Sequence, residues 1–106
     1  TEDEYVADLA HEFGYPLVVV APNMLGVINQ TLQTLIVAAT FREGLSVAGI
    51  VLNDHRPPSA ADHDPSVKTN QQELQARCVP PVLARLAWQS PTFDRAVDWF
   101  TLASGK

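Results

Sequence analysis

The chain has 106 residues, of which 46% are hydrophobic, so it can bury the core of one small domain. Its formal net charge of −5 at pH 7 argues against non-specific binding to nucleic acid or to anionic lipid. The single cysteine cannot form a disulfide framework. No apolar run approaches the roughly 20 residues of a membrane span, and the acidic N-terminus is no signal peptide. We therefore expect a cytoplasmic protein that does not enter a membrane.

The first segments of the chain alternate between helix and strand patterns. Residues 1–4 have the form of a capping box, and apolar residues then recur at helical spacing as far as Phe13. Residues 16–21 are rich in β-branched side chains and lack polar alternation, which predicts a central parallel strand. Residues 27–43 predict a second helix, which Gly44 ends. Its expected inner face consists of Ile28, Leu32, Leu35, Ile36 and Ala39.

The remaining segments continue this alternation around one long loop. Residues 46–53 predict a second buried strand, and the proline-rich, charged residues 54–68 predict a loop that is long for a compact domain. A capping-box pair, Thr69 and Gln72, opens a predicted short helix, and residues 81–88 predict a weaker third strand. A serine and a proline at positions 90 and 91 then predict the start of a last helix. That helix is expected to bury Phe93, Ala96, Val97 and Phe100.

This order of elements predicts an α/β fold, with a parallel sheet and helices on both of its faces. Three strands make a thin sheet, and the first helix has no strand before it from which to cross over. We therefore interpret residues 1–106 as the second half of a larger α/β domain.

The turn "PNMLGVIN" (residues 22–29) is the first candidate binding segment, because ligands of parallel sheets bind beyond the carboxyl ends of the strands. Gly26 allows another group to approach the main chain, and the first free N–H groups of the helix suit a carboxylate or a phosphate. The alternative is an ordinary strand-to-helix turn in which Asn23 or Asn29 caps the helix.

A second candidate is the pair Asn53-Asp54, at the end of the second strand. A side-chain amide presents one donor and one acceptor, which matches a purine edge, but an Asn-Asp turn is explained equally well by turn chemistry. The chain has no phosphate-binding loop, no nucleophile elbow and no dinucleotide fingerprint. His55, Asp62, His63 and Asp64 lack the spacing of a metal site. We therefore expect no catalytic residue and no metal ligand in the chain.

Taken together, the segments from Pro16 to Asp54, "PLVVVAPNMLGVINQTLQTLIVAATFREGLSVAGIVLND", resemble the second half of dethiobiotin synthetase. The Leu-Gly-x-Ile-Asn turn, the helix rich in threonine and leucine, and the Ala-Gly-x-Val-x-Asn strand carry this resemblance. "VPPVLARLAW" (residues 79–88) is similar to the family's proline-rich strand, which ends in a Pro-Trp pair.

The resemblance implies a three-layer, P-loop NTPase-like sheet, of which this chain is the C-terminal half. It also implies a homodimeric, cytoplasmic ligase of biotin biosynthesis. That enzyme uses ATP and Mg²⁺ to convert 7,8-diaminopelargonic acid and CO₂ into dethiobiotin, with release of ADP and phosphate. The Walker loop, the catalytic lysines and the metal-binding segment would precede Thr1, so we expect the isolated chain to be inactive.

The resemblance also assigns expected roles to individual residues. The turn that receives the substrate's carboxylate across the dimer interface matches Leu25, Gly26, Val27 and Asn29. The asparagine that reads adenine matches Asn53, with Asp54 beside it, and the segment that flanks the base matches Pro80 and Pro81.

The sequence departs from the family pattern in the second half of the chain and at one helix position. Gln30 stands where histidine is common, Arg85 where an acid is frequent, and Ala87 where proline usually precedes Trp88. Two alternatives remain open at this point. One is a non-catalytic, P-loop-derived module for binding or dimerisation, and the other is a cobyrinate-type amidotransferase synthetase of the same fold.

Overall fold

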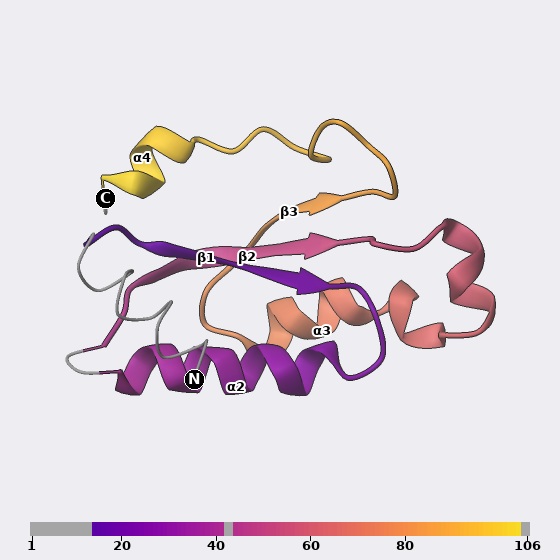
Figure 1. The fold of residues 1–106 in the computed structure, drawn as a ribbon, viewed down its shortest axis with the longest axis horizontal. Coiled ribbons are helices and arrows are strands. Elements are labelled where there is room, and N and C mark those ends of the chain that lie inside the picture. The colour runs from indigo at the N-terminus through magenta and orange to yellow at the C-terminus, as the bar shows by residue number, and fades with distance from the viewer. Residues whose placement is uncertain (1–13, 42–43, 105–106) are drawn as a thin grey trace.

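The structure is a computed structural model, and it describes residues 14–41 and 44–104. The first predicted helix lies outside these residues. Within them, the strands β1 (Leu17–Pro22), β2 (Val47–Asn53) and β3 (Val82–Leu86) form one parallel sheet in the order β1-β2-β3 (Figure 1). The prediction of three parallel strands is confirmed.

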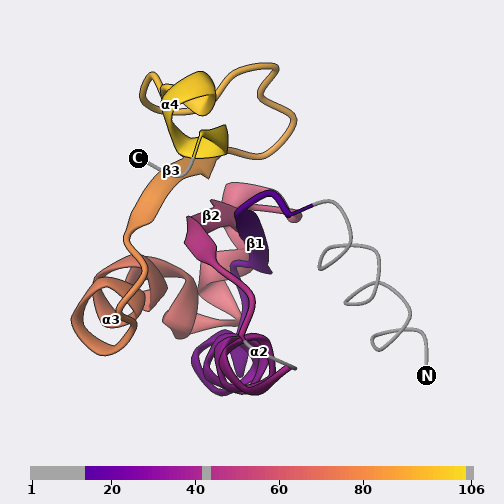
Figure 2. The same ribbon diagram turned by 90° about the vertical axis from the view of Figure 1, so that its left-hand side faces the viewer.

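Helices flank this sheet. The helices α2 (Val27–Thr40) and α3 (Asn70–Arg77) lie on one side of it, and the short helix α4 (Trp99–Ala103) lies on the other side, next to β3 (Figures 1 and 2). The long segment after β2 contains two short 3₁₀ helices, η1 (Pro58–Asp62) and η2 (Pro65–Lys68), beyond the carboxyl ends of the strands. The fold is therefore an α/β arrangement with helices around a parallel sheet, as predicted.

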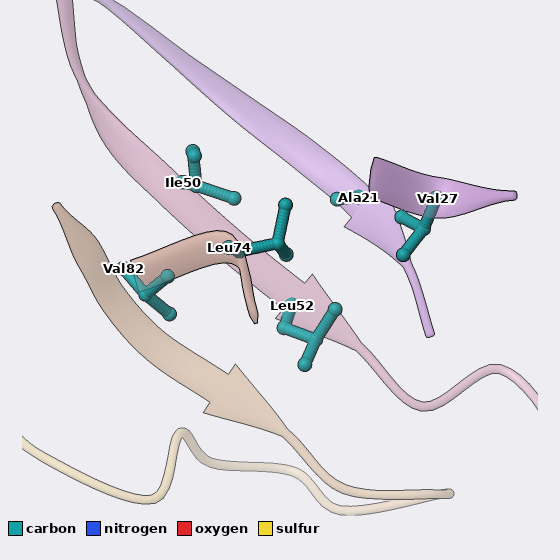
Figure 3. Close-up of a cluster of buried hydrophobic side chains, with 6 residues drawn as sticks. All are labelled: Ala21, Val27, Ile50, Leu52, Leu74 and Val82. Carbon is teal, nitrogen blue, oxygen red and sulfur yellow. The ribbon is translucent and has the colours of Figure 1, made fainter. Parts of the chain in front are cut away.

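The core lies between the sheet and the two helices α2 and α3. Its buried side chains come from all of these elements (Figure 3): Ala21, Val27, Ile50, Leu52, Leu74 and Val82. On α2 the buried residues are Val27, Thr31 and Ala38, whereas Ile36 is 62% exposed. The predicted inner face was therefore partly wrong, because the helix turns a neighbouring stripe toward the sheet and leaves Ile36 outside.

Both strand ladders skip a residue near the amino ends of the strands. Along β1 and β2, the register passes from Leu17↔Val47 to Val18↔Gly49. Along β2 and β3, it passes from Ile50↔Val82 to Val51↔Ala84. From these points on the pairing is regular, so the carboxyl ends of the strands lie level with one another.

The predicted helix from residue 91 does not form, because α4 begins only at Trp99. The reason is a tertiary contact. The backbone N–H of Arg85 donates to the Asp94 carboxylate at 2.7 Å, and the N–H of Asp94 donates to the Arg85 carbonyl at 3.0 Å, so residues near 94 lie along β3. Phe93 and Phe100 are 37% and 86% exposed, so the expected burial of this segment is also wrong.

Candidate functional site

The carboxyl edge of the sheet brings the predicted binding segments together. The N–H of Asn23, just after β1, donates to the carbonyl of Asn53 at 2.8 Å. The N–H of Asp54, just after β2, donates to the carbonyl of Leu86 at 2.9 Å. Three strand ends that are far apart in the sequence therefore form one continuous edge.

The Gly26 turn opens α2 at this edge. Gly26 is the N-cap residue, with φ of 90°, and no side chain caps the helix start. Glycine suits this left-handed conformation because a Cβ atom would be strained there. Leu25 and Asn29 are exposed, whereas Val27 is buried and can contribute only its backbone. Neither Asn23 nor Asn29 caps the helix, so the alternative of an asparagine-capped turn is wrong.

A carboxylate from the long loop already contacts this turn. The backbone N–H of Leu25 donates to Asp64 Oδ2 at 2.7 Å. The same oxygen accepts from the Arg56 guanidinium at 2.9 Å, and the other oxygen accepts from the hydroxyl and the N–H of Ser66. The Ser66 hydroxyl, the Leu25 N–H and Arg56 hold the pKa of the Asp64 carboxyl at about 2, although burial opposes this shift. Asp64 therefore remains an anion next to the helix start.

At the end of β2, the carboxylate of Asp54 is paired within the protein and the neighbouring amide of Asn53 is not. Asp54 accepts from Arg85 Nε at 2.7 Å and from the second guanidinium nitrogen at 3.1 Å, and its Oδ1 also accepts from Asn23 at 2.6 Å. The side-chain amide of Asn53 makes no hydrogen bond to any residue that the structure describes. Asn53 is therefore available to a ligand, whereas Asp54 is bound within the protein.

A small pocket of about 110 Å³ adjoins Asp54. Its walls come from the ends of all three strands and from the long loop: Asn23, Asp54, Arg56, Pro57, Pro58, Ala60, Val67, Arg85, Ala87 and Trp88. Arg56 Nε, one of the polar atoms of this wall, is buried and has no partner among the described residues. The pocket thus combines cationic and aromatic groups.

The structure does not bring Pro80 and Pro81 to this edge. Both residues precede β3, and the Pro81 carbonyl accepts from the N–H of Ile50 at 2.8 Å, in the first half of β2. Asp54 lies four positions after Ile50, which corresponds to ~13 Å along an extended strand. Because β3 runs parallel to β2, its far end carries Ala87 and Trp88 to the edge instead.

Other candidate groups lie away from the edge or lack partners. The described residues contain no cluster of His, Cys, Asp or Glu side chains that could hold a metal ion. Cys78 packs against the core, and burial raises the pKa of its thiol, which opposes thiolate chemistry.

No helix in the described part of the chain is long and apolar enough to cross a membrane.

Sequence reasoning missed two buried asparagines. Asn23 and Asn70 are 2% and 3% exposed, and Asn70 donates to Asn23 Oδ1 at 2.9 Å. Asn23 was considered only as a cap, and Thr69, beside Asn70, was expected to cap α3 but makes no capping hydrogen bond. No local pattern predicts a pair that is separated by 47 residues.

The sequence of the chain is similar to those of known proteins. Residues 1–94 match the model of the AAA domain family. The chain is 43% identical over 96 residues to the ATP-dependent dethiobiotin synthetase BioD of Anaeromyxobacter dehalogenans (strain 2CP-1 / ATCC BAA-258), a match that spans 91% of the chain and 40% of the relative. It is 34% identical over 95 residues to the protein of the same name from Bacillus cereus (strain B4264), across 90% of the chain and 37% of the relative.

No solved structure matches the chain. The chain spans about 40% of the length of the curated relatives that it matches most extensively. The parallel sheet, its flanking helices and the match over residues 1–94 agree on one P-loop NTPase-like α/β fold. The chain therefore belongs to the AAA domain family and is homologous to part of the ATP-dependent dethiobiotin synthetases.

Proposed function

We propose that the chain is the C-terminal part of a cytoplasmic, homodimeric dethiobiotin synthetase. That enzyme converts 7,8-diaminopelargonic acid, CO₂ and ATP, with Mg²⁺, into dethiobiotin, ADP and phosphate. The observation that carries the proposal is the meeting of the Gly26 turn with the Asn53-Asp54 strand end at one edge of the sheet. The names of the relatives support it, because each is an ATP-dependent dethiobiotin synthetase.

The Gly26 turn is proposed to receive the substrate's carboxylate. The helix start has no side-chain cap, so the first-turn N–H groups of Ile28 and Asn29 have no side-chain acceptor at the cap position. The N–H of Leu25 already donates to Asp64, so the substrate's carboxylate would be received by the first-turn N–H groups instead. Leu25, Gly26 and Asn29 also lie exposed, as a site shared across a dimer interface requires.

The Asn53 amide is proposed to read the adenine of ATP. It is unpaired within the described residues, and its donor and acceptor complement a purine edge. We place Ala87 and Trp88, rather than Pro80 and Pro81, beside the base, because they line the pocket next to Asp54. An aromatic ring suits such a contact by stacking.

The phosphates and Mg²⁺ do not fit the described residues. These residues offer no cluster of metal ligands, and the sequence contains no phosphate-binding loop. We propose that both groups are held by a part of the enzyme outside this chain. The chain on its own should then have no synthetase activity and should bind ATP weakly or not at all, which calorimetric titration can measure.

A non-catalytic binding or dimerisation module is the second candidate. A groove of about 390 Å³ favours it, because its walls are mostly apolar side chains of α2 and of the segment before β3. This module would keep the Gly26 turn as a structural feature only. A cobyrinate-type synthetase would instead keep ATP turnover and accept a different carboxylic acid.

The test uses the complete enzyme and follows ATP-dependent formation of dethiobiotin. Gly26→Val should raise the KM for diaminopelargonic acid steeply and leave ATP affinity near wild type, because the β-branched residue is strained at this φ. Asn53→Ala should weaken ATP binding by about 1–3 kcal/mol and reduce discrimination between ATP and GTP. Mixed dimers of the two variants should recover part of the activity if the site is shared between subunits. Unchanged kinetics in both variants would contradict the assignment.

A further inference from the structure

Two buried amides connect the proposed substrate turn to the proposed base-reading strand end. Asn23 follows β1 and Asn70 opens α3, and their side chains are 2% and 3% exposed. Buried amides are costly unless their hydrogen bonds are satisfied. Here the Asn70 amide donates to Asn23 Oδ1 at 2.9 Å, so each side chain depends on the other for its position.

One arm of this amide pair reaches the substrate turn. Asn70 also donates to the Met24 carbonyl at 3.0 Å and to the Ser66 hydroxyl at 3.3 Å. Ser66 in turn donates to Asp64, whose other oxygen accepts from the N–H of Leu25. Asn70 therefore contacts the backbone just before Gly26 directly and also supports the carboxylate beside it.

The other arm reaches the nucleotide edge. The Asn23 amide donates to Asp54 Oδ1 at 2.6 Å and to the Val67 carbonyl at 3.1 Å. The guanidinium of Arg85 also donates two hydrogen bonds to Asp54, from Nε to Oδ2 at 2.7 Å and from Nη2 to Oδ1 at 3.1 Å. Asp54 directly follows Asn53, so its position fixes the strand end that carries the proposed base-reading amide.

We propose that Asn70 is a positioning residue that sets the substrate turn directly and the nucleotide edge through Asn23. This inference rests on the proposed function, because that function assigns ligands to the turn beside one arm and to Asn53, which adjoins the end of the other arm. Its physical basis is geometric. One amide nitrogen donates to acceptors from β1's turn and from the long loop, so its loss frees both binding segments at once.

The test is Asn70→Asp in the complete enzyme. The new side chain has nearly the same shape, but it has no amide donor and places a charge against Asn23 Oδ1 and the Met24 carbonyl. The KM values for diaminopelargonic acid and for ATP should both rise about fivefold or more, with a smaller change in kcat. Leu74→Val, one helical turn along α3, is the matched control, because Leu74 is fully buried and apolar. It should lower the melting temperature and leave both KM values at wild type.

A folded Asn70→Asp enzyme in which both KM values stay within about twofold of wild type, or in which only one of them rises, would overturn the inference. If this variant does not fold, Ser66→Ala decides the question. It removes the hydroxyl bridge between Asn70 and Asp64, and it should raise the KM for diaminopelargonic acid. A wild-type KM in Ser66→Ala would contradict the substrate arm. Failure of the proposed function is recognised separately, because the wild-type enzyme would then form no dethiobiotin.

Discussion

At the amino ends of the strands both ladders skip a residue, whereas at the carboxyl ends the three strands are paired in regular register. The chemistry of the two ends differs as well. The amino end borders an apolar groove whose wall includes Val79, which is 98% exposed, and the carboxyl end carries the buried amides Asn23 and Asn70 and the paired carboxylate Asp54.

The two ends differ because one positions apolar side chains and the other positions hydrogen-bonded polar side chains. Apolar packing is less directional than hydrogen bonding, so the apolar end can accommodate one strand residue that is left out of each ladder. Hydrogen bonds between side chains on different strands require their atoms within a few tenths of an ångström, so the polar end needs level strands. Substitutions at the two ends should therefore have different consequences for stability and for ligand binding.

The largest effect is expected at the amino end, from Gly49→Ala. A Cβ at this position would lie 2.8 Å from the Pro81 carbonyl oxygen and closer still to the Leu83 side chain. Because one of these neighbours is backbone, the strands would have to separate, at a cost of about 3 kcal/mol in the free energy of unfolding. Gly26→Ala is the matched control, because a Cβ there meets nothing within 4 Å and only the positive φ is unfavourable, at about 1 kcal/mol.

Denaturant unfolding of both glycine variants checks this order. Equal losses of stability would show that the close approach of β2 and β3 at Gly49 does not limit the packing of the amino end.

At the carboxyl end, Asp54→Ala should cost about 2 kcal/mol of unfolding free energy, because it leaves the Arg85 fork and the Asn23 amide without their acceptor. Asp54→Asn keeps an acceptor oxygen and should lose less. Thermal unfolding of the two variants measures the difference. Indistinguishable melting temperatures for wild type and Asp54→Ala would show that the pair contributes nothing to the polar end.

The comparison also separates what the sequence predicts from what it does not. β1 and β2 were predicted within a residue or so, since continuous β-branched runs bounded by turn residues have few other interpretations. The Gly26 turn was also located correctly, because glycine before a helical pattern is a local signal. The last helix was wrong because a local Ser-Pro signal was overruled by the pairing of Asp94 with Arg85, nine residues away.

The candidate site was less predictable for the same reason. The contact of Leu25 with Asp64 joins residues 39 positions apart, and no spacing rule indicates it. The two prolines lie before β3, at the end of the sheet away from Asp54, and a motif fixes the order of residues along a strand but not the end at which a ligand meets them. Only the register of β2 and β3 shows that Trp88 reaches the edge.

A smaller, pH-dependent effect should distinguish Asp64 from an ordinary surface carboxylate. The pKa of Asp64 is lowered to about 2, so its contribution to stability is complete above its ordinary pKa of 3.8 and is lost as the pH falls toward 2. The difference in unfolding free energy between wild type and Asp64→Asn should therefore be constant above about pH 5 and shrink below about pH 4.

Asp98→Asn is the control for this titration. Hydrogen bonds from the hydroxyl and the N–H of Thr101 lower the pKa of Asp98 at the start of α4, away from the carboxyl edge. Both variants should lose their effect on stability in acid, but only Asp64→Asn should change the KM for diaminopelargonic acid at neutral pH. A pH-independent difference between wild type and Asp64→Asn would contradict the anionic contact with the Leu25 N–H.

The smallest effect on the fold is expected on the outer face of α2, next to the apolar groove. Ile36 and Val37 are 62% and 55% exposed, so Ile36→Ser should change the unfolding free energy of a protomer by no more than about 0.5 kcal/mol. If this face forms part of the proposed homodimer, the same substitution should raise the dimer dissociation constant, because it removes one apolar side chain from the contact surface. Gln33→Ser, exposed on the same helix, is the matched polar control and should leave both quantities unchanged. Sedimentation of the complete enzyme across a range of concentrations measures the dissociation constant, and a value in Ile36→Ser equal to that of wild type would place the dimer contact elsewhere.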